Sequence, residues 1–223
     1  PPGVSMTLAA RHPVKLSAFD DATRELVRLA ALVAAADEGT VRDALATAAV
    51  AASPVWIEEV LLQSYLFAGF PRALNAMREW RRLPAGSVRG EARRGASDPD
   101  AGDLERLRAR GEATCRLVYG RMYERLRANI DVLHPALDEW MIVEGYGKVL
   151  SRPALDLPRR ELCIVAACAA SGQDRQLHSH LHGALNVGVA PEVMTSAIEA
   201  LGSVVGEQRA RAVRMLWARV LGK

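Results

Sequence analysis

The fold is decided by residues 24–31, Arg-Glu-Leu-Val-Arg-Leu-Ala-Ala. They return in changed form at residues 160–167 as Arg-Glu-Leu-Cys-Ile-Val-Ala-Ala. Each stretch opens an apolar segment that is rich in helix-forming residues and has no strict alternation of apolar and polar side chains. Both segments are therefore predicted to be helices, and their recurrence predicts that one unit occurs twice in the chain.

The correspondence between the two halves extends beyond these segments. Pro54 and Pro191 each begin a later helix, with a difference of one residue in register. Two unrelated helical segments of similar composition would rarely share glycine, proline and tryptophan at the same spacing. We therefore predict that the chain arose by duplication of one unit. From the two prolines onward the halves align without a gap, and the matching pairs are Gly69 with Gly206, Arg72 with Arg209, Ala73 with Ala210, and Trp80 with Trp217.

The predicted fold class is all-α, because Pro, Gly and Ser/Asp clusters divide the chain into helical pieces and leave no convincing strand. Each repeat is too small to bury its own apolar faces, so the two copies are expected to pack together. The predicted helices span 18–36, 38–52, 54–68, 70–82, 103–129, 134–148, 158–170, 172–187, 191–205 and 207–221. The predicted domains are a first repeat at 18–83, a flexible linker at 84–102, an additional helical segment at 103–157 and a second repeat at 158–221.

The composition indicates a chain that buries a sizeable core. Half of the residues are apolar and a quarter are charged, with a mean hydropathy of +0.01. The 29 basic and 26 acidic residues are interspersed, so no basic face is predicted and nucleic acid is not an expected partner. No apolar run has the roughly 18 residues that a membrane helix needs, so no membrane partner is expected either.

The three cysteines, Cys115, Cys163 and Cys168, are odd in number and lack the spacing of a disulfide framework or a zinc site. They indicate a reducing compartment. Because the chain also opens without a charged-then-apolar signal, we expect a cytoplasmic location. Cys163 and Cys168 lie on an apolar helix away from its N-terminus and are expected in the core.

Chemically capable side chains are densest between Glu161 and Asn186. The helices predicted at 158–170 and 172–187 form a tight hairpin in which Glu161 and His180 can lie side by side. A carboxylate beside an imidazole holds the ring in one tautomer, as a general acid or base requires. A buried Glu–His pair that serves only as a structural hydrogen bond is the alternative interpretation.

The start of the second helix of this hairpin is expected to bind substrate oxygen atoms. Ser171 and Asp174 form a Ser-x-x-Asp pattern, which predicts Ser171 as the N-cap. From there Gln173, Gln176 and His180 fall at i, i+3 and i+7, on one helical stripe. The positive end of the helix dipole lies at the same place and suits an anionic substrate or a developing oxyanion.

No metal and no cofactor are predicted. His178 and His182 share a helix face at i, i+4, but a third ligand is missing from their neighbourhood. A zinc site normally needs at least three protein ligands.

The tryptophans recur with helical partners and are mostly expected to pack in the core. Trp140 is the exception, because it lies in the additional segment that could roof the cleft beside His180. It is therefore a candidate substrate-binding residue.

Several stretches carry a family resemblance: Tyr146 to Leu155, Arg160 to Leu162 and His180 to Gly188 in the second half, and Glu58 to Gln63 with Tyr65 to Ala73 in the first. On these residues the sequence resembles the carboxymuconolactone decarboxylase family, which is related to alkylhydroperoxidase D. The resemblance implies an all-α, alkylhydroperoxidase D-like fold and symmetric homo-oligomers, commonly trimers or hexamers.

The peroxidase branch of that family carries a Glu, a Cys-x-x-Cys and a His in this order. Glu161 and His180 occupy the Glu and His positions here, but Gln173 and Gln176 occupy the cysteine positions. Glutamine cannot be a nucleophile toward peroxide, so peroxiredoxin-type activity is not expected. The His position of the first repeat is Ala44, so a second site of this kind is not expected.

The decarboxylase branch does not need the cysteines. The resemblance implies a cofactor-free lyase acting on a small carboxylated lactone or related acid. On this hypothesis His180 donates a proton and Glu161 orients it, while Gln173 and Gln176 bind oxygen atoms and Arg152 is an anion clamp.

Two other functions stay open. The first is a non-catalytic oligomeric binding or scaffold protein, in which the Glu–His pair only holds the hairpin together. The second is a thiol redox protein that uses one of the three cysteines.

Overall fold

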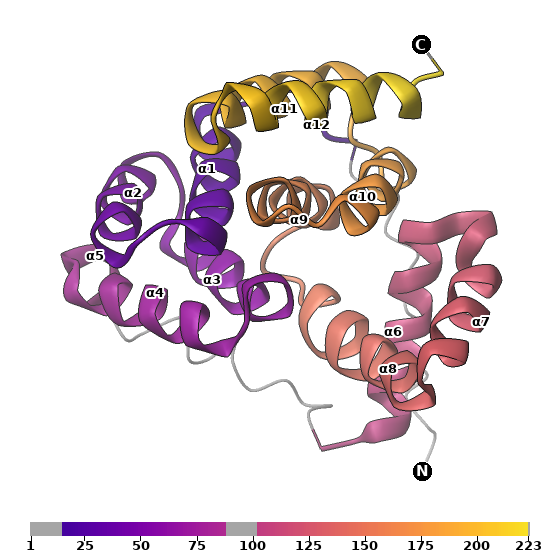
Figure 1. The fold of residues 1–223 in the computed structure, drawn as a ribbon. Coiled ribbons are helices and arrows are strands. Elements are labelled where there is room, and N and C mark those ends of the chain that lie inside the picture. Colours follow the sequence, from indigo (N-terminus) through magenta and orange to yellow (C-terminus); the bar gives the residue numbers. More distant parts are fainter. Residues whose placement is uncertain (1–14, 88–101, 223) are drawn as a thin grey trace.

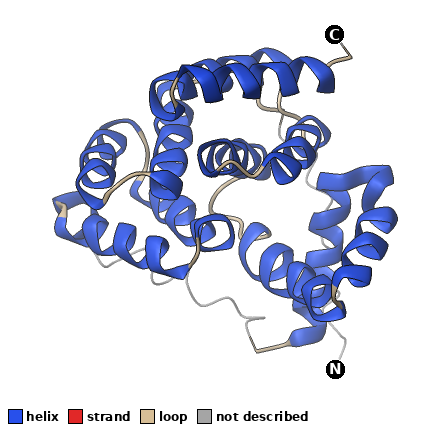
Figure 2. Ribbon diagram, viewed as in Figure 1, coloured by secondary structure: helices blue, strands red, loops and turns tan. Residues whose placement is uncertain are grey.

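The computed structural model describes residues 15–87 and 102–222. These two ranges form helices and contain one isolated β-bridge but no strand, so the predicted all-α class is confirmed (Figure 2). The helices of the first half are α1 (Asp21–Ala35), α2 (Glu38–Ala51), α3 (Pro54–Ala68), α4 (Phe70–Arg82) and the short α5 (Pro84–Ser87).

The second half begins with the additional segment and ends with four helices that follow the same succession as α1 to α4. The additional segment contains α6 (Leu104–Tyr119), the 3-10 turn η1 (Gly120–Met122), α7 (Tyr123–Leu133), α8 (Pro135–Trp140) and the π-helix η2 (Met141–Leu150). The last four helices are α9 (Leu157–Ser171), α10 (Asp174–Asn186), α11 (Pro191–Val205) and α12 (Glu207–Val220).

Helix α9 lies at the centre of the fold, in contact with α1, α3, α10 and α11 (Figure 1). Residues 160–169 are all buried, including the charged Arg160 and Glu161. Residues 162–169 are apolar around the whole circumference of the helix, as is typical of a central helix. Asp156 caps its start by accepting a hydrogen bond from the Arg159 amide at 3.0 Å. Within the described ranges neither α9 nor any other helix is long and apolar enough to cross a membrane.

Equivalent positions of the two halves have the same local geometry. Gly69 joins α3 to α4 with φ 83° and ψ 158°, and Gly206 joins α11 to α12 with φ 80° and ψ 158°. The indole N–H of Trp80 donates to Glu58, and that of Trp217 donates to Thr195. Both hydrogen bonds are 3.0 Å long and span 22 residues, so the same turn and the same packing recur in the chain.

The prediction of a single helix at 103–129 is wrong, because the chain turns at Gly120. Its φ of 51° and ψ of −127° lie in a region that glycine enters readily and other residues avoid. Helix α6 therefore ends at Tyr119, and α7 begins at Tyr123 after one 3-10 turn. These two helices are separate elements of the additional segment.

The helix predicted at 134–148 also divides, at the junction of α8 and η2. The amide of Ser151 bonds to the carbonyl oxygen of Tyr146, five residues earlier, as in a π-helix. Residues of η2 lie directly against the backbone of α6. A Cβ atom at Gly111 would lie 2.1 Å from the Ile142 carbonyl oxygen, so this crossing needs glycine.

Ser171 does not cap α10, contrary to the prediction. It is the last residue of α9, and its hydroxyl donates to the Ala167 carbonyl oxygen at 2.8 Å. Gly172 takes the left-handed conformation with φ 73° and ends α9. Gln173 then becomes the N-cap without a side-chain hydrogen bond, and α10 begins at Asp174.

The first residues of the predicted linker 84–102 are helical. They form α5, which packs on α4, because Arg81 donates to the Gly86 carbonyl oxygen at 2.8 Å. A Cβ atom at Gly86 would lie 2.0 Å from the Trp80 carbonyl oxygen, so the contact is close. Residues 88–101 of that predicted linker lie outside the described part of the chain.

Candidate functional site

Glu161 on α9 and His180 on α10 face each other across the hairpin. Oε2 of Glu161 lies 2.8 Å from Nδ1 of His180. Glu161 is fully buried and His180 is 5% exposed. With Nδ1 held by the carboxylate, Nε2 is the ring nitrogen that can exchange a proton.

One atom on each side of this pair has no partner among residues 15–87 and 102–222. Within these ranges, Oε1 of Glu161 is the single fully buried polar side-chain atom without a hydrogen bond. Nε2 of His180 also has no hydrogen bond within these ranges, but this nitrogen is partly accessible to solvent. A buried polar group without a hydrogen bond lowers the stability of the fold by about 1–3 kcal/mol. A hydrogen-bond donor that reached Oε1 of Glu161 would therefore stabilise the site.

Gly183 lets the carboxylate approach α10. A Cβ atom at this position would lie 2.8 Å from Oε2 of Glu161 and 2.6 Å from Cγ1 of Val118 on α6. Asn186, further along α10, donates to the Val118 carbonyl oxygen at 2.7 Å. Helices α6, α9 and α10 therefore meet at the Glu161 carboxylate.

Aromatic rings from two other helices contact the imidazole, and a third ring packs against one of them. Phe67 of α3 and Tyr119 of α6 lie edge-on to the His180 ring, with centroid distances of 5.6 and 6.3 Å. Tyr146 of η2 lies edge-on to Tyr119 at 6.2 Å. Phe67 and Tyr119 are not among the predicted site residues, because only tertiary packing brings them to His180 from distant segments.

All three cysteines lie in the core, and burial raises the pKa of each thiol to about 12. The negative charge of Glu161 contributes to the raised pKa of Cys115 and Cys168. None of the three forms a disulfide. Thiols with such pKa values are protonated at neutral pH and are poor nucleophiles.

Three predicted substrate-binding residues have exposed side chains. Gln173 and Gln176 are exposed, and Trp140 at the end of α8 is 60% exposed. The structure gives none of the three a hydrogen bond or ring contact to Glu161 or His180. The predicted stripe of both glutamines with His180 is not observed, because the imidazole is buried and the glutamines face solvent.

Arg152, predicted as an anion clamp, holds a carboxylate of the protein itself. Its Nε and Nη2 lie 2.8–3.0 Å from the two oxygens of Glu59 on α3. Arg160, which is fully buried on α9, donates to the same carboxylate at 2.7 Å and to Gln63 at 3.1 Å. These contacts tie α3 to the helix that carries Glu161.

The charge of Glu59 is stabilised in this network. Burial opposes its ionisation, but the hydrogen bonds from Arg152 and the positive charge of Arg160 outweigh that effect and lower the pKa of Glu59.

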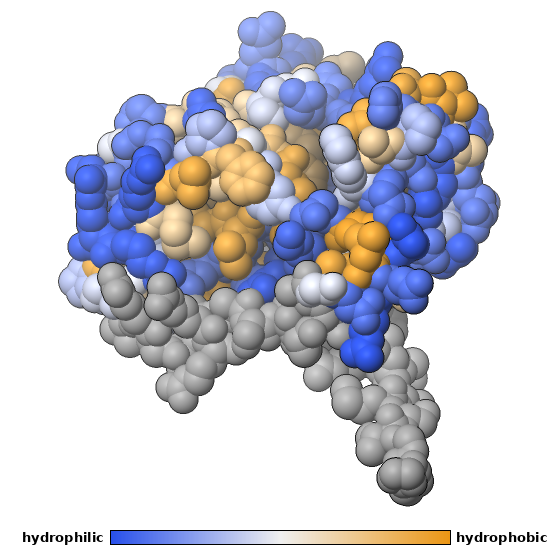
Figure 3. Space-filling view, turned by 90° about the horizontal axis from the view of Figure 1, so that it is seen from below, coloured by the Kyte–Doolittle hydropathy of each residue, from blue (hydrophilic) through white to orange (hydrophobic). Residues whose placement is uncertain are grey.

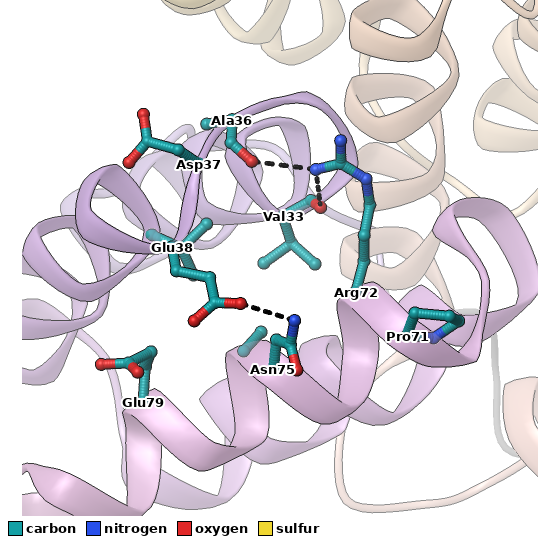
Figure 4. A pocket seen from close by; sticks show the side chains of 10 residues that line it. Val33, Ala36, Asp37, Glu38, Pro71, Arg72, Asn75 and Glu79 are labelled. Atoms are coloured by element: carbon teal, nitrogen blue, oxygen red, sulfur yellow. Dashed lines mark hydrogen bonds between the residues drawn. The ribbon is translucent and has the colours of Figure 1, made fainter.

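A hollow of about 280 Å³ lies in the first half, between α1, α2 and α4 (Figure 4). Arg72 donates to the Ala36 carbonyl oxygen at 2.9 Å, and Asn75 donates to Glu38 at 2.6 Å. These two hydrogen bonds, dashed in Figure 4, cross the hollow from α4 to Ala36, which follows α1, and to the start of α2. The Glu–His pair is not part of its lining.

The residues that the structure describes contain no cluster of three metal-ligating side chains. The rings of His178 and His182 lie edge-on, with their centroids 4.9 Å apart on α10. Burial, with the neighbouring charge of His178, lowers the pKa of His182.

The chain is similar to a known family and to a curated relative. Residues 137–219, from α8 into α12, match the sequence profile of the Carboxymuconolactone decarboxylase family, and this range contains Glu161 and His180. The chain is 32% identical over 148 residues to Peroxisomal protein 2 of Schizosaccharomyces pombe. The alignment covers 63% of this chain and 64% of that protein, so the chain spans less than two thirds of the relative's length.

Proposed function

Because residues 137–219 match the sequence profile of the carboxymuconolactone decarboxylase family, we propose a cofactor-free decarboxylase that removes CO₂ from a small carboxylated lactone. The observation that carries the proposal is the buried 2.8 Å contact between Glu161 Oε2 and His180 Nδ1, inside the matched residues. The pair supplies a proton donor that is held in one orientation.

In the proposed reaction the substrate carbon loses CO₂ and gains a proton. The protonated imidazole of His180 donates from Nε2, and Glu161 stabilises its positive charge and fixes the ring. The aromatic rings of Phe67 and Tyr119 lie against the imidazole and make its surroundings less polar than water. A carboxylate that enters this apolar surround is less well solvated than in water, which favours its loss as CO₂.

The experiment is a CO₂-release assay on a panel of carboxylated five-membered lactones. We expect His180→Ala to lower turnover by about 10²–10⁴-fold, because proton transfer by a positioned side chain contributes about this much. His178→Ala, on the exposed side of the same helix, is the matched control and should keep wild-type turnover. Turnover that survives in His180→Ala contradicts the proposal.

Substrate binding by Gln173, Gln176 and Trp140 stays a prediction. Their exposed side chains could meet a substrate as it enters. An anion that used Arg152 would have to displace Glu59.

A second candidate function is the non-catalytic oligomeric binding or scaffold protein, which the near-complete burial of His180 favours. Figure 3 shows apolar areas on one face of the molecule, set among hydrophilic residues. Such surfaces suit a homo-oligomer, for which the family resemblance suggests a trimer or hexamer. Exposed apolar side chains include Leu62 of α3, Phe70 and Leu74 of α4, Val132 and Leu133 of α7, and Leu137 of α8.

A thiol redox function ranks third. Its reactive group would have to be one of three buried thiols whose pKa values lie near 12. Neither Gln173 nor Gln176 can replace a thiolate.

We further infer that residues 18–83 and 158–221 are repeats of one unit. The matched glycine turns at Gly69 and Gly206, and the matched indole hydrogen bonds, support this inference. The cytoplasm is the proposed location. The name of the Schizosaccharomyces pombe relative makes the peroxisome the alternative, which imaging of a tagged full chain would test.

A further inference from the structure

One face of α3 contacts both helices of the hairpin that carries the Glu–His pair. Glu59, Gln63 and Phe67 lie at i, i+4 and i+8 of α3, so their side chains share this face. Glu59 and Gln63 bond to Arg160 at the start of α9. The ring of Phe67 lies edge-on to that of His180 on α10, with the centroids 5.6 Å apart. A helix of the first half therefore contacts the hairpin at two places.

Gln63 and Arg160 form two hydrogen bonds with each other. Nη1 of Arg160 donates to the side-chain oxygen of Gln63 at 3.1 Å, and the side-chain nitrogen of Gln63 donates back to the Arg160 carbonyl oxygen at 3.3 Å. Both residues are buried. Gln63 thus holds the backbone of Arg160 as well as its side chain, directly before Glu161 in the chain.

The other two nitrogens of the Arg160 guanidinium also have partners. Nε donates to the Leu155 carbonyl oxygen at 3.1 Å, and Nη2 donates to Glu59 at 2.7 Å and to the Arg152 carbonyl oxygen at 3.1 Å. Without Gln63, Nη1 would lose its acceptor in a fully buried place, and the guanidinium would have to shift to reach another. Because the next residue of α9 carries the carboxylate of the pair, such a shift also moves that carboxylate.

The corresponding arginine of the first half has no such network among the described residues. On the proposed duplication, Arg24 corresponds to Arg160. Ser196 and Ala200 of α11, which packs on α1, stand where α3 has its carboxylate and its amide. The side chain of Arg24 is 42% exposed and pairs with Asp21 of its own helix. The buried network therefore accompanies the half that carries the imidazole.

We propose that Gln63 is a positioning residue for the Glu161/His180 pair. Its hydrogen bonds with Arg160 fix the first turn of α9, so that Glu161 meets Nδ1 of His180. The role in catalysis rests on the proposed function of the pair. Stability alone gives no reason for the network, because well-packed apolar side chains in place of buried ion pairs are often as stable. Positioning does give one, since a 1 Å displacement of a reacting group can cost about 10²-fold in rate.

The test compares variants of the full chain by NMR of the imidazole nitrogens and in the CO₂-release assay. Gln63→Met keeps the length of the side chain and removes both hydrogen bonds. We expect the Nδ1 signal of His180 to change. We also expect kcat to fall by about 10-fold, because a shift of a few tenths of an ångström costs less than one of 1 Å. KM should change little, since Gln63 is buried beside Arg160 and not beside the imidazole.

Ser64→Ala is the matched control on the same helix. The buried hydroxyl of Ser64 donates to the Leu61 carbonyl oxygen at 2.7 Å, and its loss leaves both bonds between Gln63 and Arg160 in place. This variant should keep the wild-type Nδ1 signal and turnover. If Gln63→Met does not fold, Gln63→Asn takes its place with the same expected changes, because its amide is one methylene too short to form both bonds.

The outcomes separate this inference from the function on which it rests. A wild-type Nδ1 signal in a folded Gln63 variant overturns the inference, and so do equal changes in that variant and in Ser64→Ala. The NMR measurement needs no substrate. A changed Nδ1 signal in a protein that is inactive on the whole lactone panel therefore overturns the proposed function and supports the positioning of the pair by Gln63.

Discussion

Replacing Gly183 by alanine tests directly whether the Glu161/His180 contact depends on the close approach of α9 and α10. The added Cβ would lie 2.8 Å from Glu161 Oε2 and 2.6 Å from Val118 Cγ1, whereas ordinary contacts begin at 3.4 Å. Val118 lies on α6, which Asn186 fastens to α10. The carboxylate must therefore move by several tenths of an ångström, which lengthens its 2.8 Å contact with His180.

The magnitude follows from comparison with a glycine that has free space. Gly202 lies inside α11, and a Cβ there meets nothing within 4 Å. Both substitutions gain the same helix propensity, about 1 kcal/mol. Gly183→Ala also forces atoms together in a packed site. Its free energy of unfolding should therefore be about 1–3 kcal/mol below that of Gly202→Ala.

Two measurements on both variants decide the outcome. Urea unfolding gives the stability difference, and NMR of the imidazole nitrogens reports the tautomer of His180. We expect the Nδ1 signal to change in Gly183→Ala and to stay as in wild type in Gly202→Ala. Equal stabilities together with an unchanged imidazole spectrum would refute the proposed dependence on Gly183.

The remaining predictions concern the buried ion network and the thiols. Glu59→Gln should lower the free energy of unfolding in urea by about 3–5 kcal/mol, because it leaves the buried charge of Arg160 unpaired. The control Glu144→Gln removes a half-exposed ion pair with Lys148 and should change that free energy by less than about 1 kcal/mol. The pKa of Glu59 is lowered on folding, so its stabilisation is present above its usual value of 4.5 and is lost as pH falls through the folded-state value. The thermal midpoint of wild type should thus fall more steeply in acid than that of Glu59→Gln. A chromogenic disulfide reagent at pH 8 should label none of the cysteines before unfolding, and rapid labelling of the folded protein would contradict their raised pKa values.

The helical fold and the Glu161/His180 contact could be predicted because both depend on local patterns. Helix periodicity and breakers give the elements, and a short hairpin between two helices limits where their side chains can meet. One turn between α9 and α10 thus suffices to bring a carboxylate and an imidazole 19 residues apart to within 2.8 Å.

What could not be predicted depends on tertiary contacts or on special backbone geometry. The sequence around Gly120 continues a helical pattern, and only its positive φ ends α6 there. A π-helix is rare, and the residues of η2 continue the helical pattern of α8, so the two elements could not be separated. The partner of Arg152 could not be predicted either, since Glu59 lies 93 residues away.

On the proposed duplication, Glu25 of the first half corresponds to Glu161 of the second, and the two carboxylates have different surroundings. In the first half, Glu25 forms an ion pair with Arg28 at 2.9 Å, and Ala44 stands where the second half has His180. In the second half the additional segment supplies Tyr119 and Val118 beside the pair. The proposed chemistry therefore needs more than an imidazole. On that alignment, a histidine introduced at Ala44 would correspond to His180, but its carboxylate, Glu25, is already paired with Arg28. We therefore expect no proton-transfer site in the first half.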